Sequence, residues 1–283
     1  MSDKNYNLDD LLYLMSRLRD PETGCPWDIK QTFASIVPHT IEEAYEVADA
    51  IEKQDYPHLK EELGDLLFQV IFYSQMGKEQ QHFEFEDIIH TLVQKLVRRH
   101  PHVFPSGELH SENNDIRLSD DEIKGRWEQI KAQEREEKEL AASPQKSQSD
   151  YVSILSDIPN VLPALQRAEK LQKRAATVGF DWPEATQVLD KIEEEIGELR
   201  EAMAENNQAN IQDELGDLMF AMTNLARHVN VKSEMAVRST NQKFVDRFQY
   251  IEQVLHEKGV ALEDASLEEM EALWQKAKQA LKA

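Results

Sequence analysis

The sequence predicts an all-α protein built from two tandem helical modules. Apolar residues recur every three or four positions along most of the 283-residue chain, as they do on one face of a helix. The chain has only 9 Gly and 10 Pro, too few for a turn-rich β protein, and no segment shows a clear strand pattern. An acidic pattern in the first half also returns in the second half, which indicates duplication of a small helical module.

Five helical stripes follow one another in the first half of the chain. They cover residues 8–18, 41–51, 63–73, 88–97 and 127–140, the last of them strongly charged. Pro21 ends the first stripe, because proline cannot continue a helix. His100–Phe104 is expected to be a loop that ends a helix, since its histidines do not have the spacing of a zinc site.

A change in composition divides the chain. Residues 135–150 lose the apolar periodicity and gain Ser, Gln and Pro, which is typical of a linker or a frayed helix end. We therefore expect an N-terminal domain at 1–145, linker included, and a C-terminal domain at 146–283. Each domain has a tryptophan, Trp27 or Trp182, just after a glycine turn. Either ring could stack on a nucleobase or fill a small core, and the core is slightly favoured.

The acidic composition limits the partners of this chain. Lys and Arg number 32 against 54 Asp and Glu, a formal net charge of −22, so we expect no direct nucleic-acid binding and no anionic membrane. The single cysteine, Cys25, rules out a disulfide within the chain and suits a reducing compartment. No signal-peptide pattern opens the chain, and the apolar run Leu66–Tyr73 is too short to cross a bilayer. A cytoplasmic protein is expected.

Each domain carries a quartet of carboxylates with the same internal spacing. A Glu-x-x-Glu is followed by a Glu-x-x-Asp at the same separation in both copies. Residues three apart share a helix face, so two antiparallel helices could bring each quartet to one point. Oxygen ligands in that number suit Mg²⁺, or Mn²⁺, better than zinc. The predicted metal ligands are Glu43, Glu46, Glu62 and Asp65 in the first domain and Glu195, Glu198, Glu214 and Asp217 in the second.

A solvated acidic helix face is the simpler interpretation of one quartet, but the repetition favours a metal site. Glu42 and Glu194 precede the quartets and are turned about 100° around the helix. Each could orient a metal-bound water or accept its proton, or be an ordinary surface residue. Gly64 and Gly216 interrupt the helical pattern at a cost of about 1 kcal/mol. They indicate either tight helix packing or a close approach of a ligand.

Basic residues suited to phosphate recognition close each domain. Lys95 and Arg99 share a helix face in the first domain, as Lys243 and Arg247 do in the second. Ordinary surface pairs or salt bridges are the alternative. The second domain also carries basic residues ahead of the turn with Trp182, which joins them as a candidate for nucleotide binding. These residues are Lys170, Lys173 and Arg174.

The quartets and several local motifs resemble the MazG nucleoside triphosphate pyrophosphohydrolases of the all-α pyrophosphatase superfamily. The shared motifs are EE-x-x-E followed by ELGD, GCPWD near the start, RRHPHVF at 98–104 and RWEQIK at 126–131. The tandem arrangement is similar to that of the long bacterial members in particular. The resemblance covers nearly the whole chain apart from the linker.

The resemblance implies a fold and an activity. Each module would be a helical hairpin that pairs with another module to complete a four-helix bundle, and the protein would be a homodimer. It would use Mg²⁺ to cleave canonical or damaged nucleoside triphosphates between the α and β phosphorus atoms. The carboxylates of both quartets would bind the metal. Lys243 and Arg247, and also Lys95 and Arg99, would hold phosphates.

Two other classes of function remain open. A regulatory protein could use the quartets as a metal- and nucleotide-binding scaffold with little catalysis. An acidic mimic of nucleic acid would explain the net charge but not the repeated spacing. Between the two copies, the basic residues at both ends of the second module favour that module as the main catalyst.

Overall fold

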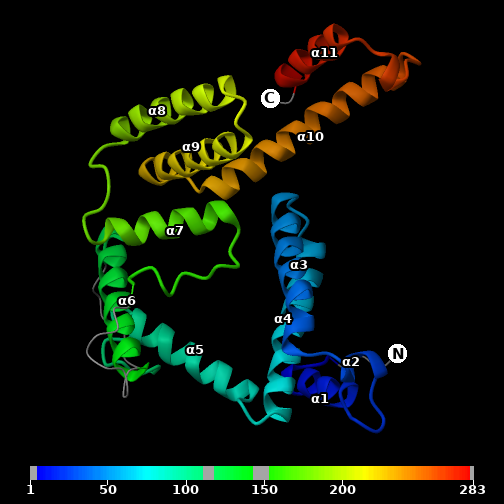
Figure 1. Cartoon of the computed structure of the whole chain (residues 1–283). Helices are drawn as coiled ribbons and strands as arrows, with labels where there is room; N and C mark the ends of the chain where they lie inside the picture. The colour runs from blue at the N-terminus through cyan, green and yellow to red at the C-terminus, as the bar shows by residue number, and fades with distance from the viewer. Residues whose placement is uncertain (1–4, 111–117, 143–152, 281–283) are drawn as a thin grey trace. The chain divides into compact units, whose positions relative to one another are not determined.

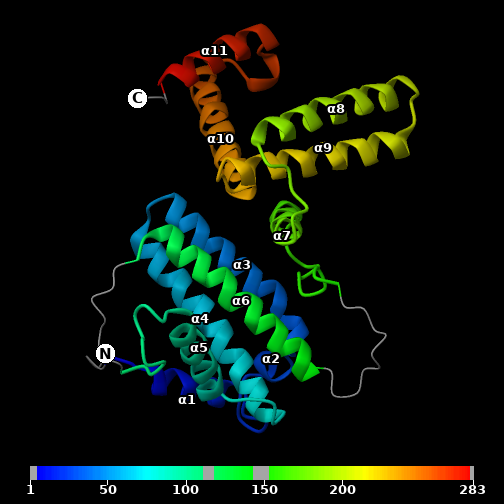
Figure 2. The same cartoon turned by 90° about the vertical axis from the view of Figure 1, so that its left-hand side faces the viewer.

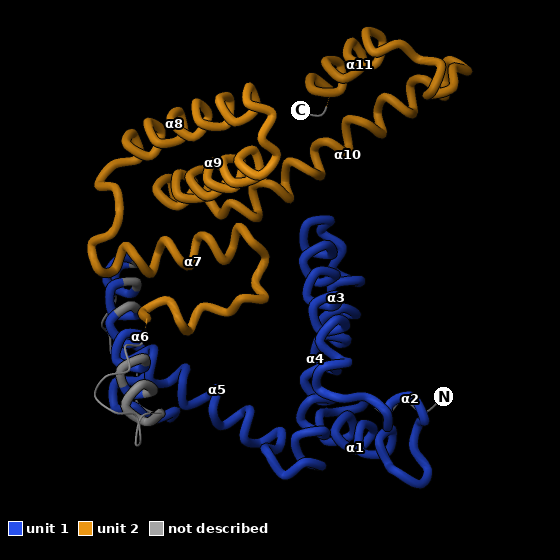
Figure 3. Tube along the Cα trace, in the orientation of Figure 1, with its two compact units in different colours: residues 1–145 blue, residues 146–283 orange. Residues whose placement is uncertain are grey.

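A computed structural model describes residues 5–110, 118–142 and 153–280 of the chain. Throughout these residues the regular elements are helices, with no strand, so the all-α prediction is confirmed. The chain forms two compact units, residues 1–145 and 146–283, and each is described by itself (Figure 3). The step from one unit to the next falls at 143–152, outside the described residues.

The first unit is built around an antiparallel helical hairpin. Its helices are α1 (Leu8–Leu18), α2 (Pro26–Ile29), α3 (Phe33–Glu52), α4 (Tyr56–Glu79), α5 (Phe85–Arg99) and α6 (Asp120–Ala142). The hairpin consists of α3 and α4, which lie side by side in Figures 1 and 2. Thr32 caps the start of α3 and Asp55 caps the start of α4, so local side chains fix where both helices of the hairpin begin.

A compact apolar core fixes α1 against this hairpin. Met15 of α1, Ile36 of α3 and Phe72 of α4 belong to one buried cluster, together with Ile71 and Met76. This core lies at the end of the hairpin where α3 starts and α4 finishes.

The helices α5 and α6 are joined by an ion-pair cluster. Glu134 of α6 accepts hydrogen bonds from Arg99 at 2.5 Å and Arg98 at 2.6 Å. These bonds, that from Arg99 first, lower the pKa of Glu134 to about 2. The helix α6 continues to Ala142, so the segment that the sequence assigned to a linker or frayed end begins as helix. His100 follows α5 as its cap, which agrees with the predicted end of that helix.

The second unit repeats the hairpin with different surroundings. Its helices are α7 (Ala164–Ala176), α8 (Ala185–Ala204), α9 (Gln208–His228), α10 (Ser233–Glu257), a short 3₁₀ helix (Leu262–Asp264) and α11 (Leu267–Ala280). The antiparallel hairpin is α8 with α9 (Figures 1 and 2). Further along, Ile251, Leu255 and Leu273 form a separate core between α10 and α11. None of the described helices is long and apolar enough to span a membrane.

One packing prediction was wrong for the single chain, and of the two alternatives left open for the glycines, tight helix packing is not found within the unit. Trp27 and Trp182 do not fill a core, since their exposed fractions are 53% and 40%. Gly64 and Gly216 do not mark a tight contact within the unit, because a Cβ at either position would have no described atom within 4 Å. Both glycines therefore face open space on the hairpins of the isolated chain.

Candidate functional site

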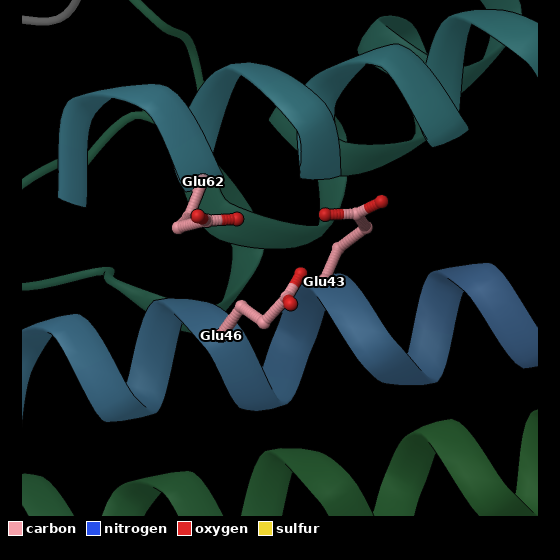
Figure 4. Close-up of side chains that lie close together, drawn as sticks. All are labelled: Glu43, Glu46 and Glu62. Carbon is pink, nitrogen blue, oxygen red and sulfur yellow. The ribbon is translucent and has the colours of Figure 1, made fainter. Parts of the chain in front are cut away.

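The first hairpin brings three carboxylates together. Glu43 and Glu46 on α3 point toward Glu62 on α4, and one oxygen from each lies within 4.8 Å of the others (Figure 4). Glu43 and Glu46 lie one turn apart on the same helix face, as their spacing predicted. The fourth predicted ligand, Asp65, is not part of this compact group.

The charges of this first cluster affect each other. Burial, followed by the charges of Asp65, Glu46 and Glu62, raises the pKa of Glu43 above its ordinary value. Asp65 is thus close enough to act electrostatically although it lies outside the compact trio. A divalent cation among these groups would remove the repulsion that raises this pKa.

The second hairpin forms the equivalent cluster from a different trio. Glu195 on α8 and Glu214 and Asp217 on α9 have oxygens within 4.8 Å of one another. Glu198 lies outside this trio, but its charge is the largest cause, after burial, of a raised pKa at Glu214. Each hairpin therefore brings three members of its quartet together, and a different member stands apart in each.

The surroundings of Glu195 show whether the second cluster suits a cation. Its exposed fraction is 4%, and its Oε2 is buried with no hydrogen-bond partner among the described residues. A buried, unpaired carboxylate oxygen is costly unless a ligand binds it. The hard oxygen donors around it match the preference of Mg²⁺ or Mn²⁺. The residues present therefore fit such a cation.

Two residues that the sequence pattern did not predict contact carboxylates of the clusters or beside them. The Nζ atom of Lys191 lies 2.8 Å from Oε1 of both Glu194 and Glu195, and these bonds raise the pKa of Lys191. In the first cluster, Nε2 of His58 lies 2.6 Å from Oε1 of Glu62. The spacing in the sequence could have predicted both contacts, because each partner stands one helical turn before its carboxylate.

The two candidate proton acceptors are exposed. Glu42 lies 3.7 Å from Nδ1 of His39, and Glu194 is paired with Lys191. Both flank the compact trios without joining them. Their part in catalysis remains a prediction.

The basic residues predicted to hold phosphate have other contacts in the described structure. Arg99 is bound to Glu134, and Lys95 lines with it a hollow of about 420 Å³. The guanidinium of Arg247 lies 5.4 Å from the ring centre of Trp274, a residue that the sequence pattern did not mark as a candidate. Lys243 is exposed on α10. Among the described residues no hydrogen bond or ion pair links any of the four basic residues to a quartet.

The basic residues of α7 divide into two groups. Arg174 donates to Asp157 at 2.6 Å and to the carbonyl oxygen of Ile154. These bonds anchor the segment before α7 to that helix. Lys170 and Lys173 are exposed on the same helix. Their contact with a nucleotide stays a prediction.

Comparison with known proteins decides the family. Residues 31–104 and 184–251, which contain both quartets, match the family model described as the MazG nucleotide pyrophosphohydrolase domain. The chain belongs to the MazG family. The predicted family and its tandem arrangement are confirmed.

Similar proteins share nearly the whole length of this MazG chain. A nucleoside triphosphate pyrophosphohydrolase of Escherichia coli K12 is 48% identical over 96% of this chain and 97% of that protein. The nucleoside triphosphate pyrophosphohydrolase/pyrophosphatase MazG of Thermotoga maritima is 39% identical over 98% of both chains. The uncharacterized protein YabN of Bacillus subtilis is 40% identical over 94% of this chain but only 50% of its own length.

Proposed function

We propose that this protein hydrolyses nucleoside triphosphates, canonical and also damaged, at the α–β bond to give nucleoside monophosphate and pyrophosphate. The observation that carries the proposal is the convergence of Glu195, Glu214 and Asp217 with one buried, unpaired oxygen on Glu195. The relatives named as nucleoside triphosphate pyrophosphohydrolases support the choice of substrate. Such a substrate is consistent with a protein of the cytoplasm, without a nucleic acid or membrane partner.

Mg²⁺, or Mn²⁺ in its place, is the proposed cofactor. When bound, such an ion lowers the pKa of a bound water and neutralises charge on the transferring phosphoryl group. In the second module Glu195, Glu214 and Asp217 would hold it, with Glu198 as the remaining ligand of the quartet. Glu194 would take the proton of the attacking water, and its bond to Lys191 fixes where that carboxylate lies.

Phosphate binding is assigned to basic residues that lie outside the quartets. Lys243 and Arg247 would stabilise negative charge on the pyrophosphate leaving group. Neither of them is linked to the quartet among the described contacts of one chain, so we propose that a second copy in a homodimer completes the site. Lys170, Lys173, Arg174 and Trp182 are assigned to the nucleotide of the same module.

The first module is the weaker candidate for catalysis. Glu43, Glu46, Glu62 and Asp65 are proposed as its metal ligands, Glu42 as its proton acceptor, and Lys95 and Arg99 as its phosphate contacts. Arg99 is already bound to the buried Glu134, however. This contact favours a metal- and nucleotide-binding scaffold as the alternative function of the first module.

The test is an assay of Mg²⁺-dependent turnover with the eight common nucleoside triphosphates, resolving the products by chromatography. Monophosphate with pyrophosphate supports the proposal, whereas diphosphate with orthophosphate contradicts it. Glu195→Gln should lower the rate at least about 100-fold, because it removes a charged ligand. Glu193→Gln, the same change at an exposed position of α8, is the matched control and should keep the rate.

A further inference from the structure

His58 occupies a defined position beside the first cluster. Its backbone N–H donates to Oδ1 of Asp55 at 3.1 Å, which fixes the residue in the first turn of α4. One turn later, Glu62 presents Oε1 at 2.6 Å from Nε2 of His58. The side chain of Glu62 is 10% exposed and that of His58 is 42% exposed. The imidazole thus reaches from the solvent side to a largely buried carboxylate.

This contact has no counterpart at the aligned position of the second module. Asn210 stands one turn before Glu214, as His58 stands before Glu62, and no hydrogen bond of its side chain is found among the described residues. In the second cluster the buried carboxylate is Glu195, which lies on the other helix of the hairpin. Lys191 binds its Oε1, and its Oε2 has no hydrogen-bond partner among the described residues.

The two modules therefore share the same kind of contact to a buried carboxylate, although the residues that make it differ. In each carboxylate cluster, the most buried member is held at one oxygen by a side chain that stands one turn earlier on the same helix. Because a held carboxylate loses little further freedom when its second oxygen binds a cation, such a contact favours metal binding.

We propose that His58 is a positioning residue of the first cluster. Its Nε2–H donates to Oε1 of Glu62 and orients this carboxylate toward Glu43 and Glu46. The inference rests on the proposed role of Glu62 as a metal ligand. Partners of this kind are typically worth about 10- to 100-fold in metal affinity.

The experiment measures Mn²⁺ binding to the full chain by electron paramagnetic resonance. The parent carries Glu195→Gln and Asp217→Asn, so that the first cluster is the remaining carboxylate site. His58→Ala should weaken Mn²⁺ binding about tenfold, and His58→Gln, whose amide N–H can reach the same oxygen, should recover most of it. His90→Ala, at an exposed position of α5, is the control and should leave the affinity unchanged.

Outcomes that overturn the inference are clear. Unchanged or tighter Mn²⁺ binding in His58→Ala would do so, as would a failure of His58→Gln to recover affinity. Equal thermal unfolding of the metal-free variants separates a positioning role from a loss of folding. A parent that binds no Mn²⁺ also overturns it, while the product assay on the unaltered protein judges the proposed hydrolysis separately.

Discussion

Glu43 shows how a proposed metal ligand lowers the stability of the protein when no metal is bound. Its carboxylate is surrounded by Glu46, Glu62 and Asp65, and burial with these charges raises its pKa. A group whose pKa is raised by folding destabilises the folded state while it is ionised. The contribution of Glu43 to the stability of the metal-free protein should therefore rise as the pH falls from neutral through the raised pKa toward the ordinary value.

We predict opposite effects of Glu43→Gln in the two metal states. Without metal, the variant should unfold at a higher temperature than the parent at pH 7, because one repelling charge is removed. Its affinity for Mg²⁺ should fall at least about tenfold, since indirect partners alone are worth that much. Calorimetric unfolding with and without Mg²⁺ measures both effects. Glu61→Gln, on the exposed face of α4, is the control, and an equal response of both variants would count against the site.

Glu134 illustrates the reverse case at the same scale. Hydrogen bonds from Arg99 and Arg98 lower its pKa to about 2 from an ordinary 4.5. A group with a lowered pKa contributes its stability above the ordinary value and loses it as the pH falls through the lowered one.

Glu134→Gln should consequently destabilise the contact between α5 and α6 by about 2 kcal/mol at neutral pH. The difference from the parent should shrink between pH 4.5 and pH 2, the window that the two pKa values define. Urea unfolding at a series of pH values measures it. Glu137→Gln removes a longer contact, 3.5 Å from Arg98, and should have a small effect. A difference that does not depend on pH would contradict the assignment.

At the scale of the helix, local side chains cap the starts of α3 and α4. The carboxylates share helix faces because their spacing follows the α-helical period. The end of α4, in contrast, depends on a neighbouring segment. A Cβ at Gly77 would lie 2.7 Å from the backbone oxygen of Phe83, so only glycine fits this turn without movement.

Replacement of this glycine should therefore destabilise the first unit. We expect Gly77→Ala to cost about 1–3 kcal/mol, the usual range for overpacking a close contact. Gly125→Ala, inside α6 with no described atom within 4 Å, should instead stabilise by up to about 1 kcal/mol. Thermal unfolding of both variants compares them. A neutral Gly77→Ala would show that the loop at Phe83 gives way easily.

At the scale of the whole molecule, both hairpins leave apolar side chains exposed. The exposed fractions are 49% at Leu63 and 41% at Leu67 in the first unit, and 46% at Leu215 and 50% at Met219 in the second. Exposed apolar groups in register on a helix face are typical of an interface. Gly64 and Gly216 lie in the same stretches with open space above them.

These faces favour the proposed homodimer. Sedimentation should give a mass about twice the 32.7 kDa of one chain at micromolar concentration. Leu67→Lys combined with Met219→Lys should shift the protein toward monomer and lower the rate of hydrolysis with it. Val161→Lys, at an isolated position that is 89% exposed, should do neither. A parent that sediments as a monomer would refute the dimer.

The sequence by itself determined the all-α class, the duplication and the faces on which the carboxylates lie. These properties follow from local periodicity, which a linear pattern records directly. It also carried enough of the family motifs for the family to be predicted correctly. The residues Glu43 and Glu195 could thus be named as candidate metal ligands from their spacing alone.

Only the tertiary structure decided which side chains meet. In the structure a different trio of carboxylates converges in each module, and Arg99 is bound to Glu134. Trp27 and Trp182 lie at the surface. The structure also places His58 and Lys191 against the buried carboxylates. The physical reason is that burial, crossing of helices and competition for ion-pair partners depend on residues distant in the chain, and these do not appear in a local pattern.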